Sequence, residues 1–206
     1  MSGMFTIGLD LGQRNDPSAV VMVEQRRHPY RQGNDPVLRV RMAERIPLGT
    51  GFGEVAQMMR HVVQVANREA WQVGVRSACK LVIDATGLGR PVVEMVKDAV
   101  TGLTPGCSII AVTITSGDKQ HYRSGEGSSM NVPKQDLIAE LQLALDSQEL
   151  KIAARMREAG TLTRELLDMR MHQRQSGYVR YGADGTGQHD DLVIALALAV
   201  WRARRF

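Results

Sequence analysis

The 206-residue chain has few aromatic residues, two cysteines and no long apolar run, and each shortage excludes a class of site. Phe, Tyr and Trp make up 4% of the chain, which argues against base stacking as a main mode of binding nucleic acid. Cys79 and Cys107 have neither zinc-ligand spacing nor the pattern of a disulfide framework, so we expect structural thiols. The longest apolar run, residues 192–201, is too short to cross a bilayer, and we expect no membrane partner.

The overall composition is ordinary for one globular domain, which we expect to span residues 1–206. Charged residues make up 23% of the chain and hydrophobic residues 43%. The formal net charge of +4 permits a polyanionic partner without requiring one. The positions of the acids and arginines therefore carry more information than their totals.

The order of the predicted elements indicates an α/β fold. Three consecutive strands, at residues 5–12, 18–24 and 37–42, predict an antiparallel meander. Helices are then expected at 54–71, 91–100, 132–145, 162–171 and 189–202, strands at 80–85, 108–115 and 150–152, a mobile surface loop at 117–130, and a hairpin near 176–183. This order predicts a mixed sheet, with the meander and parallel strands together, flanked by helices.

Two aspartates lie in apolar runs where a carboxylate needs compensation. Asp10 lies in the first strand, and burial of an ionised carboxylate there is costly without a cation or hydrogen bonds. Asp84 follows the apolar residues 81–83 at the C-terminal end of its strand, the edge where ligand sites of α/β sheets gather. Each could equally cap the turn that follows it, so neither alone identifies a site.

A third acidic position lies at the start of the final helix, where His189 is followed by Asp190 and Asp191. An aspartate is a good N-cap there and suits the helix dipole. Capping accounts for one of the two aspartates but less well for both. The helix that follows is apolar on every face and must be buried, so a second aspartate at its start needs another reason. His189 could orient water or an acid, although a single histidine at a helix start is slightly more often structural.

Together these acids predict a metal site. Carboxylate oxygens with few histidines or cysteines suit Mg²⁺ or Mn²⁺. Two such ions about 4 Å apart can activate water and stabilise the leaving oxygen in phosphodiester hydrolysis. The ions would also offset the repulsion between the acids, and a bridging role for Asp10 between two ions is a hypothesis.

Three motifs, in this order and spacing, resemble the nuclease domain of tailed-bacteriophage terminase large subunits. They are residues 7–12 (IGLDLG), 81–87 (LVIDATG) and 187–197 (GQHDDLVIALA). Residues 132–138 (VPKQDLI), with Leu141, also resemble a stretch of the family. Each motif is loose by itself, whereas the ordered set covers nearly the whole chain.

The resemblance implies a ribonuclease H-like fold and a metal-dependent endonuclease that cleaves double-stranded viral DNA concatemers during genome packaging, with little sequence specificity. Mapped residue by residue, it makes Asp10, Asp84 and an acid of the His-Asp-Asp motif the metal ligands. Asp191 is favoured over Asp190 because related resolvases place their acid at a similar distance before the Ala-Leu-Ala run, and the choice between the two stays open.

The resemblance also implies partners in the cytoplasm of an infected host cell, namely a packaging ATPase domain or subunit, the portal and the small terminase. One departure is that the sequence contains no Gly-x4-Gly-Lys-Ser/Thr phosphate loop. We therefore expect an isolated nuclease domain or a stand-alone nuclease component that uses no nucleotide cofactor and does not hydrolyse ATP.

Basic residues near these motifs are candidate contacts to DNA phosphates, which supply affinity independent of sequence. The candidates are Arg14, Arg90, Lys134, Arg174 and Arg180. Solvated surface charge is the simpler explanation for half of them or more.

Three alternatives remain. The glycines flanking Asp10 also resemble the first phosphate loop of actin-like and sugar-kinase ATPases, which need a second lobe that this chain is too short to supply. A Holliday-junction resolvase would share the fold and metals but act on branched DNA as a dimer. A non-catalytic DNA-binding or motor-docking module would have no reason to keep Asp10, Asp84 and residues 190–191.

Overall fold

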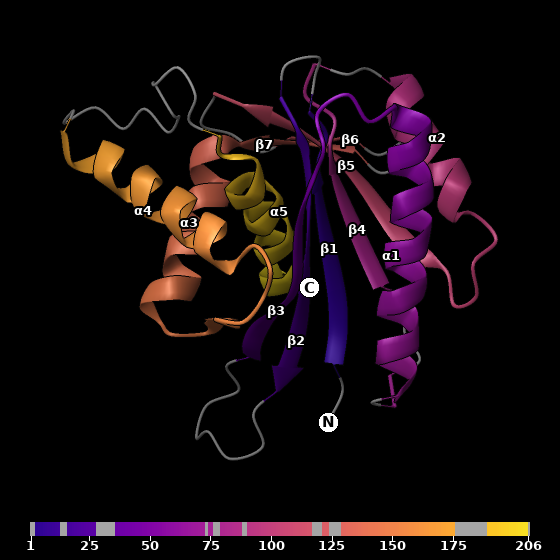
Figure 1. The fold of residues 1–206 in the computed structure, drawn as a ribbon, viewed down its shortest axis with the longest axis horizontal. Helices are drawn as coiled ribbons and strands as arrows, with labels where there is room; N and C mark the ends of the chain where they lie inside the picture. The colour runs from indigo at the N-terminus through magenta and orange to yellow at the C-terminus, as the bar shows by residue number, and fades with distance from the viewer. Residues whose placement is uncertain are drawn as a thin grey trace.

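One mixed β-sheet runs through the chain in this computed structural model (Figure 1). The structure describes residues 3–12, 16–27, 36–72, 74–75, 79–87, 90–116, 121–123, 129–175 and 189–205. Within those residues, eight strands are arranged in the order β6-β7-β5-β4-β1-β2-β3-β8, and five helices cover the two faces. The predicted fold class, a mixed sheet flanked by helices, is confirmed.

The first three strands form the predicted antiparallel meander. They are β1 (Gly3–Asp10), β2 (Ser18–Arg27) and β3 (Pro36–Ile46). β1 pairs with β2, and β2 pairs with β3, in antiparallel register. The meander places the end of β1 in the middle of the sheet, with neighbours on both sides.

The later strands extend the sheet in both directions. They are β4 (Cys79–Asp84), β5 (Cys107–Thr115), β6 (His121–Arg123), β7 (Ser129–Pro133) and β8 (Leu150–Ile152). β4 pairs parallel with β1, β5 with β4 and β7 with β5, while β8 pairs parallel with β3 and β6 is antiparallel to β7. Because β1, β4, β5 and β7 run the same way, their carboxyl ends lie at one edge of the sheet.

The helices form a layer on each face of the sheet. They are α1 (Phe52–Gln72), α2 (Arg90–Val100), α3 (Lys134–Asp146), α4 (Ala159–Gln175) and α5 (Asp191–Arg205). α1 and α2 lie on one face, to the right in Figure 1, and α3, α4 and α5 lie on the other. None of the described helices combines the length and apolar character that a membrane crossing needs.

The alternation of side chains along β1 assigns its residues to the two layers. Phe5, Ile7 and Leu9 pack in the core beneath α1 and α2. The alternate residues Thr6, Gly8 and Asp10 therefore face α5. Apolar alternation in this strand thus turns Asp10 toward the α5 side of the sheet.

α5 packs directly on β1 and is buried along nearly its whole length, as its apolar sequence predicts. A Cβ added to Gly8 would lie 1.9 Å from the carbonyl oxygen of Ala195 and 3.0 Å from the backbone nitrogen of Ala199. Only glycine permits so close an approach of helix to strand. This contact brings the N-terminus of α5 to the edge where β1 ends.

The structure adds two strands in and beside the segment predicted as a loop. β6 lies within residues 117–130, and β7 begins inside this segment and continues to Pro133, so α3 starts at Lys134 rather than at residue 132. β7 is short, with Met130 and Val132 alternating with polar residues, and it is held by parallel pairing with β5. The predicted hairpin near 176–183 lies outside the described residues.

Candidate functional site

Asp10 and Asp84 lie side by side at the ends of two adjacent parallel strands. β1 and β4 pair in register up to Leu9 opposite Ile83, and one further residue on each strand gives Asp10 and Asp84. Leu9 and Ile83 pack beneath α1 and α2, so the two aspartates that follow face α5. The structure therefore brings the first two predicted site residues together.

The N-terminus of α5 supplies two further carboxylates. Asp191 is the first residue of α5 and is 7% exposed, while Asp190 precedes it and accepts the first helical hydrogen bond, from the Ile194 amide to its carbonyl at 2.8 Å. The charges of both aspartates act on Asp10. All four predicted acids thus form one group, termed here the acidic cluster: Asp10, Asp84, Asp190 and Asp191.

The cluster holds carboxylates that are costly to ionise. The pKa of Asp10 is raised well above its usual value, first by burial and then by the charges of the other three acids. Burial also raises the pKa of Asp84, and it raises that of Asp191 to about 6. A cation among these groups would remove both the repulsion and much of the burial cost.

The loop after β4 fixes one oxygen of Asp84. Asp84 Oδ1 accepts a hydrogen bond from the Thr86 amide at 2.8 Å and another from the Thr86 hydroxyl. The same hydroxyl oxygen accepts a hydrogen bond from the Ile114 amide of β5 at 2.8 Å. The turn-capping explanation is therefore correct for this oxygen, and the network ties the orientation of Asp84 to two strands.

Lys134, the first residue of α3, lies within the acidic cluster. Its Nζ is 2.8 Å from Asp190 Oδ2. Its charge also lowers the pKa of Asp10 and of Asp84, against the effect of burial. The sequence places Lys134 among the DNA contacts, whereas the structure places its ammonium on a carboxylate, and contact with DNA stays a prediction.

Two residues that the sequence did not identify, Arg45 and Glu165, adjoin the cluster. Arg45 on β3 lies with its Nε 3.4 Å from Asp191 Oδ2, and its terminal nitrogen pairs with Glu165 of α4. Glu165 is 7% exposed, and burial raises its pKa to about 7. One signal was available, because Glu165 follows the fully buried Leu162 by three residues and so shares its helix face.

The remaining predicted residues are described only in part. His189 is half-exposed, with Nδ1 3.7 Å from Asp191 Oδ2. Arg14 and Arg180 lie outside the described residues. Arg90 begins α2 and Arg174 belongs to α4, and their side chains are outside the described part of the structure.

The donor set of the cluster fits a hard divalent cation. Its ligands are all carboxylate oxygens, the type that Mg²⁺ and Mn²⁺ prefer. Asp191 Oδ2 is buried and accepts no hydrogen bond from any described residue, although Arg45 and His189 lie nearby. As the side chains stand, no three acidic, histidine or cysteine groups among the described residues are arranged to hold an ion. Binding would therefore require these carboxylates to turn toward one another.

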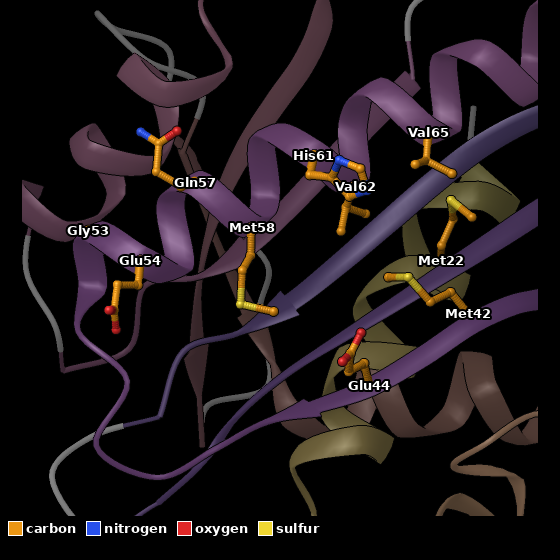
Figure 2. Close-up of a pocket in the computed structure, with 10 residues that line it drawn as sticks. All are labelled: Met22, Met42, Glu44, Gly53, Glu54, Gln57, Met58, His61, Val62 and Val65. Atoms are coloured by element: carbon orange, nitrogen blue, oxygen red, sulfur yellow. The ribbon is translucent and has the colours of Figure 1, made fainter.

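A groove on the opposite face of the sheet lies away from the acidic cluster. It has a volume of about 770 Å³ and lies between α1 and the strands β2 and β3 (Figure 2). Its lining includes Met22, Met42 and Met58, with Glu44 and Glu54 among the polar residues. The predicted acids face the other layer of helices and take no part in this groove.

The two cysteines lie beside one another at the far end of the sheet from Asp84. Cys79 and Cys107 are paired across β4 and β5, with their sulfurs 3.3 Å apart. Both thiols are free, and the neighbouring Cys79 thiol and burial raise the pKa of Cys107. Protonated thiols of this kind are poor nucleophiles, in line with the structural role expected from the sequence.

No protein-family model and no curated protein matches the sequence. Solved structures do match it. The large terminase nuclease of thermophilic phage G20c is 18% identical, with 96% of this chain and 81% of that chain covered at a TM-score of 0.56. The human cytomegalovirus terminase nuclease domain is 11% identical, with 97% of this chain and 84% of that chain covered at a TM-score of 0.56. The Mn-soaked form of that domain is also 11% identical, with 98% of this chain and 84% of that chain covered at a TM-score of 0.57. The chain therefore has the ribonuclease H-like fold of terminase nuclease domains, as the motifs in its sequence predict.

Proposed function

We propose that this chain is a divalent-metal-dependent DNA endonuclease whose site is the acidic cluster. The observation that carries the proposal is the convergence of Asp10, Asp84 and the 190–191 pair from three separate elements onto one sheet edge. A group of buried, mutually repelling carboxylates destabilises a fold unless it binds something. The likeness to terminase nucleases, one of them soaked with manganese, supports a cation as that ligand.

In this proposal, Asp10, Asp84 and Asp191 hold one or two Mg²⁺ or Mn²⁺ ions. Such ions, when bound, lower the pKa of an attacking water and stabilise the leaving oxygen of a phosphodiester. Asp10 adjoins Asp84 across the strand pair and is influenced by the charges of both α5 acids, so it would be the ligand shared between two ions. Thr86 already orients one oxygen of Asp84, so the reorientation that binding requires falls mainly on the other carboxylates.

Asp191 is the stronger candidate ligand of the α5 pair. Its Oδ2 is buried and lacks a hydrogen-bond donor among the described residues, whereas Asp190 Oδ2 already pairs with Lys134. The Asp190 side chain is also more exposed, at 28% against 9% for Asp191. Asp190 Oδ2 becomes a ligand only if Lys134 moves away. His189 Nδ1 lies 3.7 Å from Asp191 Oδ2, where the ring is placed to orient that carboxylate.

The proposed substrate is double-stranded viral DNA, cut with little sequence preference during genome packaging. The partners would be a packaging ATPase domain or subunit, the portal and the small terminase, in the cytoplasm of an infected cell. What supports this role is the terminase origin of the similar structures. Arg14, Arg90, Arg174 and Arg180 are proposed contacts to DNA phosphates, and no nucleotide cofactor is proposed.

Digestion of supercoiled plasmid tests the proposal. Wild-type protein should nick and linearise plasmid with Mn²⁺ or Mg²⁺ and leave it intact in EDTA. Asp10→Asn and Asp84→Asn keep the side-chain shape and should each lose about 100-fold or more in rate. Asp98→Asn, an exposed acid on α2, is the matched control and should cut like wild type.

Full cutting in EDTA, or by both cluster variants, would refute the two-metal site. A four-way DNA junction run beside the plasmid separates this activity from that of a resolvase. Preferential cleavage of the junction by a dimer would replace the packaging substrate with a branched one. Turnover of ATP by the purified chain would instead revive the phosphate-loop alternative.

A further inference from the structure

One row of residues crosses four strands at the edge of the acidic cluster. Asp10 on β1 pairs with Ala19 on β2, and Ala19 pairs with Arg45 on β3. On the other side, Asp84 continues the row on β4. Residues paired in this way face the same side of a sheet, so Arg45 points to the α5 layer like the aspartates. The small, fully buried side chain of Ala19 lies between Arg45 and Asp10.

Arg45 is shared between two buried carboxylates. Its terminal nitrogen pairs with Glu165 Oε1, and its Nε lies 3.4 Å from Asp191 Oδ2. Although this second distance is short, neither the Nε nor the Oδ2 makes a hydrogen bond with a described residue. The guanidinium therefore stays close to Asp191 without capturing its oxygen.

Glu165 is in turn hydrogen-bonded to the N-terminus of α5, the helix that carries Asp191. Its Oε2 accepts a hydrogen bond from the Val193 amide at 3.3 Å, in the first turn of α5. A carboxylate at a helix N-terminus is also stabilised by the helix dipole. Glu165 thus binds the backbone of α5 with one oxygen and Arg45 with the other, which locks Arg45 relative to Asp191.

We propose that Arg45 and Glu165 are positioning residues that hold the Asp191 carboxylate in place while leaving its Oδ2 open to a divalent cation. Because Glu165 binds the terminal nitrogen of Arg45, the guanidinium orients Asp191 by its charge and makes no hydrogen bond to Asp191 Oδ2. This inference rests on the proposed function, because it concerns the affinity of the acidic cluster for its metal. Partners that orient a metal-binding side chain typically change affinity by about 10-fold to 100-fold when they are removed.

Two substitutions separate geometry from charge. Arg45→Lys keeps the charge but replaces the planar guanidinium, which directs separate nitrogens at Glu165 and Asp191, with one ammonium nitrogen that cannot reproduce this fixed geometry. Glu165→Gln keeps the shape and an oxygen that can accept the Val193 amide, but it releases Arg45 to close on Asp191. Glu44→Gln is the matched control, since Glu44 is the neighbour of Arg45 on β3 and pairs at 3.7 Å with the exposed Arg157.

Titration calorimetry with Mn²⁺ on the full chain tests the inference, with the thermal midpoint in EDTA recorded for each variant. Arg45→Lys and Glu165→Gln should each weaken Mn²⁺ binding by about 10-fold or more. The double variant should lose little more than the weaker-binding single variant, because both act through one carboxylate. Glu44→Gln should bind like wild type. A merely structural role would lower the thermal midpoint and leave the affinity unchanged.

If Arg45→Lys and Glu165→Gln fold and bind Mn²⁺ with wild-type affinity, and wild type binds the ion and cuts DNA, this inference is overturned and the proposed function is not. A wild-type protein that does neither would overturn the proposed function, and the inference with it. Should a variant fail to fold, NMR of the ¹⁵N-labelled wild type decides. Addition of Mg²⁺ should shift the Arg45 Nε–H resonance and leave that of Arg157 in place, and an unmoved Arg45 signal would refute the positioning role.

Discussion

The contact between Gly8 of β1 and α5 sets the position of half the acidic cluster, and Gly8→Ala tests its importance. The added Cβ would lie 1.9 Å from the Ala195 carbonyl oxygen, whereas real Cβ atoms essentially never approach other heavy atoms within 3.0 Å. The atoms in the way belong to the backbone of α5, which cannot rotate aside as a side chain could. Strand and helix must therefore separate by about 1 Å or more.

This separation has little room to occur, because α5 is buried between the sheet and the helices α3 and α4. Overpacking of a dense core typically costs about 1–3 kcal/mol, and a backbone clash belongs at the upper end of that range. For a domain of this size, each kcal/mol lowers the thermal midpoint by about 2–4 °C. We expect Gly8→Ala to lower the midpoint by about 6–12 °C.

Differential scanning calorimetry in EDTA measures this loss, and Gly53→Ala is the matched control. Gly53 lies in α1, where an added Cβ meets nothing within 4 Å, so the substitution should be neutral or stabilising by up to about 1 kcal/mol. Because α5 carries Asp191, Gly8→Ala should also weaken Mn²⁺ binding. A Gly8→Ala protein that melts within about 2 °C of wild type and binds Mn²⁺ equally well would refute this account of helix placement.

Two further predictions concern charge. In EDTA, burial raises the pKa of Asp191 to about 6 and that of Glu165 to about 7 in the folded state, whereas both pKa values lie at about 4 in the unfolded state. The folded state therefore binds more protons between these values, and the free energy of unfolding should fall as pH rises from about 4 to about 7, by about 3 kcal/mol for Asp191 alone. Urea denaturation across this range measures the slope, which Asp191→Asn should reduce; an equal slope in that variant would contradict the prediction. Lys134→Gln removes the ammonium that offsets the negative charge of Asp10 and Asp84. Because the carboxylates of this variant should attract a cation more strongly, Mn²⁺ should raise the thermal midpoint of Lys134→Gln by more than it raises that of wild type. Scanning fluorimetry with and without Mn²⁺ tests this, and an equal or smaller rise would contradict it.

The elements that carry the acids could be predicted because their own sequences specify them. β1 and β4 are mostly apolar strands, each ending at an aspartate, and α5 is apolar on every face over most of its length. Their parallel or sequential order then placed Asp10 and Asp84 at one sheet edge. β6 and β7 could not be predicted in this way, because they span only three and five residues. The alternation of Met130 and Val132 with polar residues is too short to identify β7, which owes its place to pairing with β5.

The surroundings of the acids depend on contacts between distant residues. Arg45 and Glu165 are 120 residues apart, and nothing in either segment identifies the other as its partner. Proximity to a motif in the sequence predicts a DNA contact for Lys134. Its position in the cluster follows from β7, which runs parallel to β5 and delivers the start of α3 to the same edge as Asp84. Patterns along the chain thus locate the ligands, and only the packed fold locates the groups that orient them.

The central claim is that the acidic cluster binds a divalent cation through Asp10. Anomalous diffraction from crystals soaked in Mn²⁺ tests this most directly, because the anomalous signal identifies the ion without reference to activity. The account predicts one or two peaks within about 2.5 Å of carboxylate oxygens of Asp10, with Asp84 and Asp191 completing the site. Well-ordered crystals with no manganese within reach of Asp10 would contradict it.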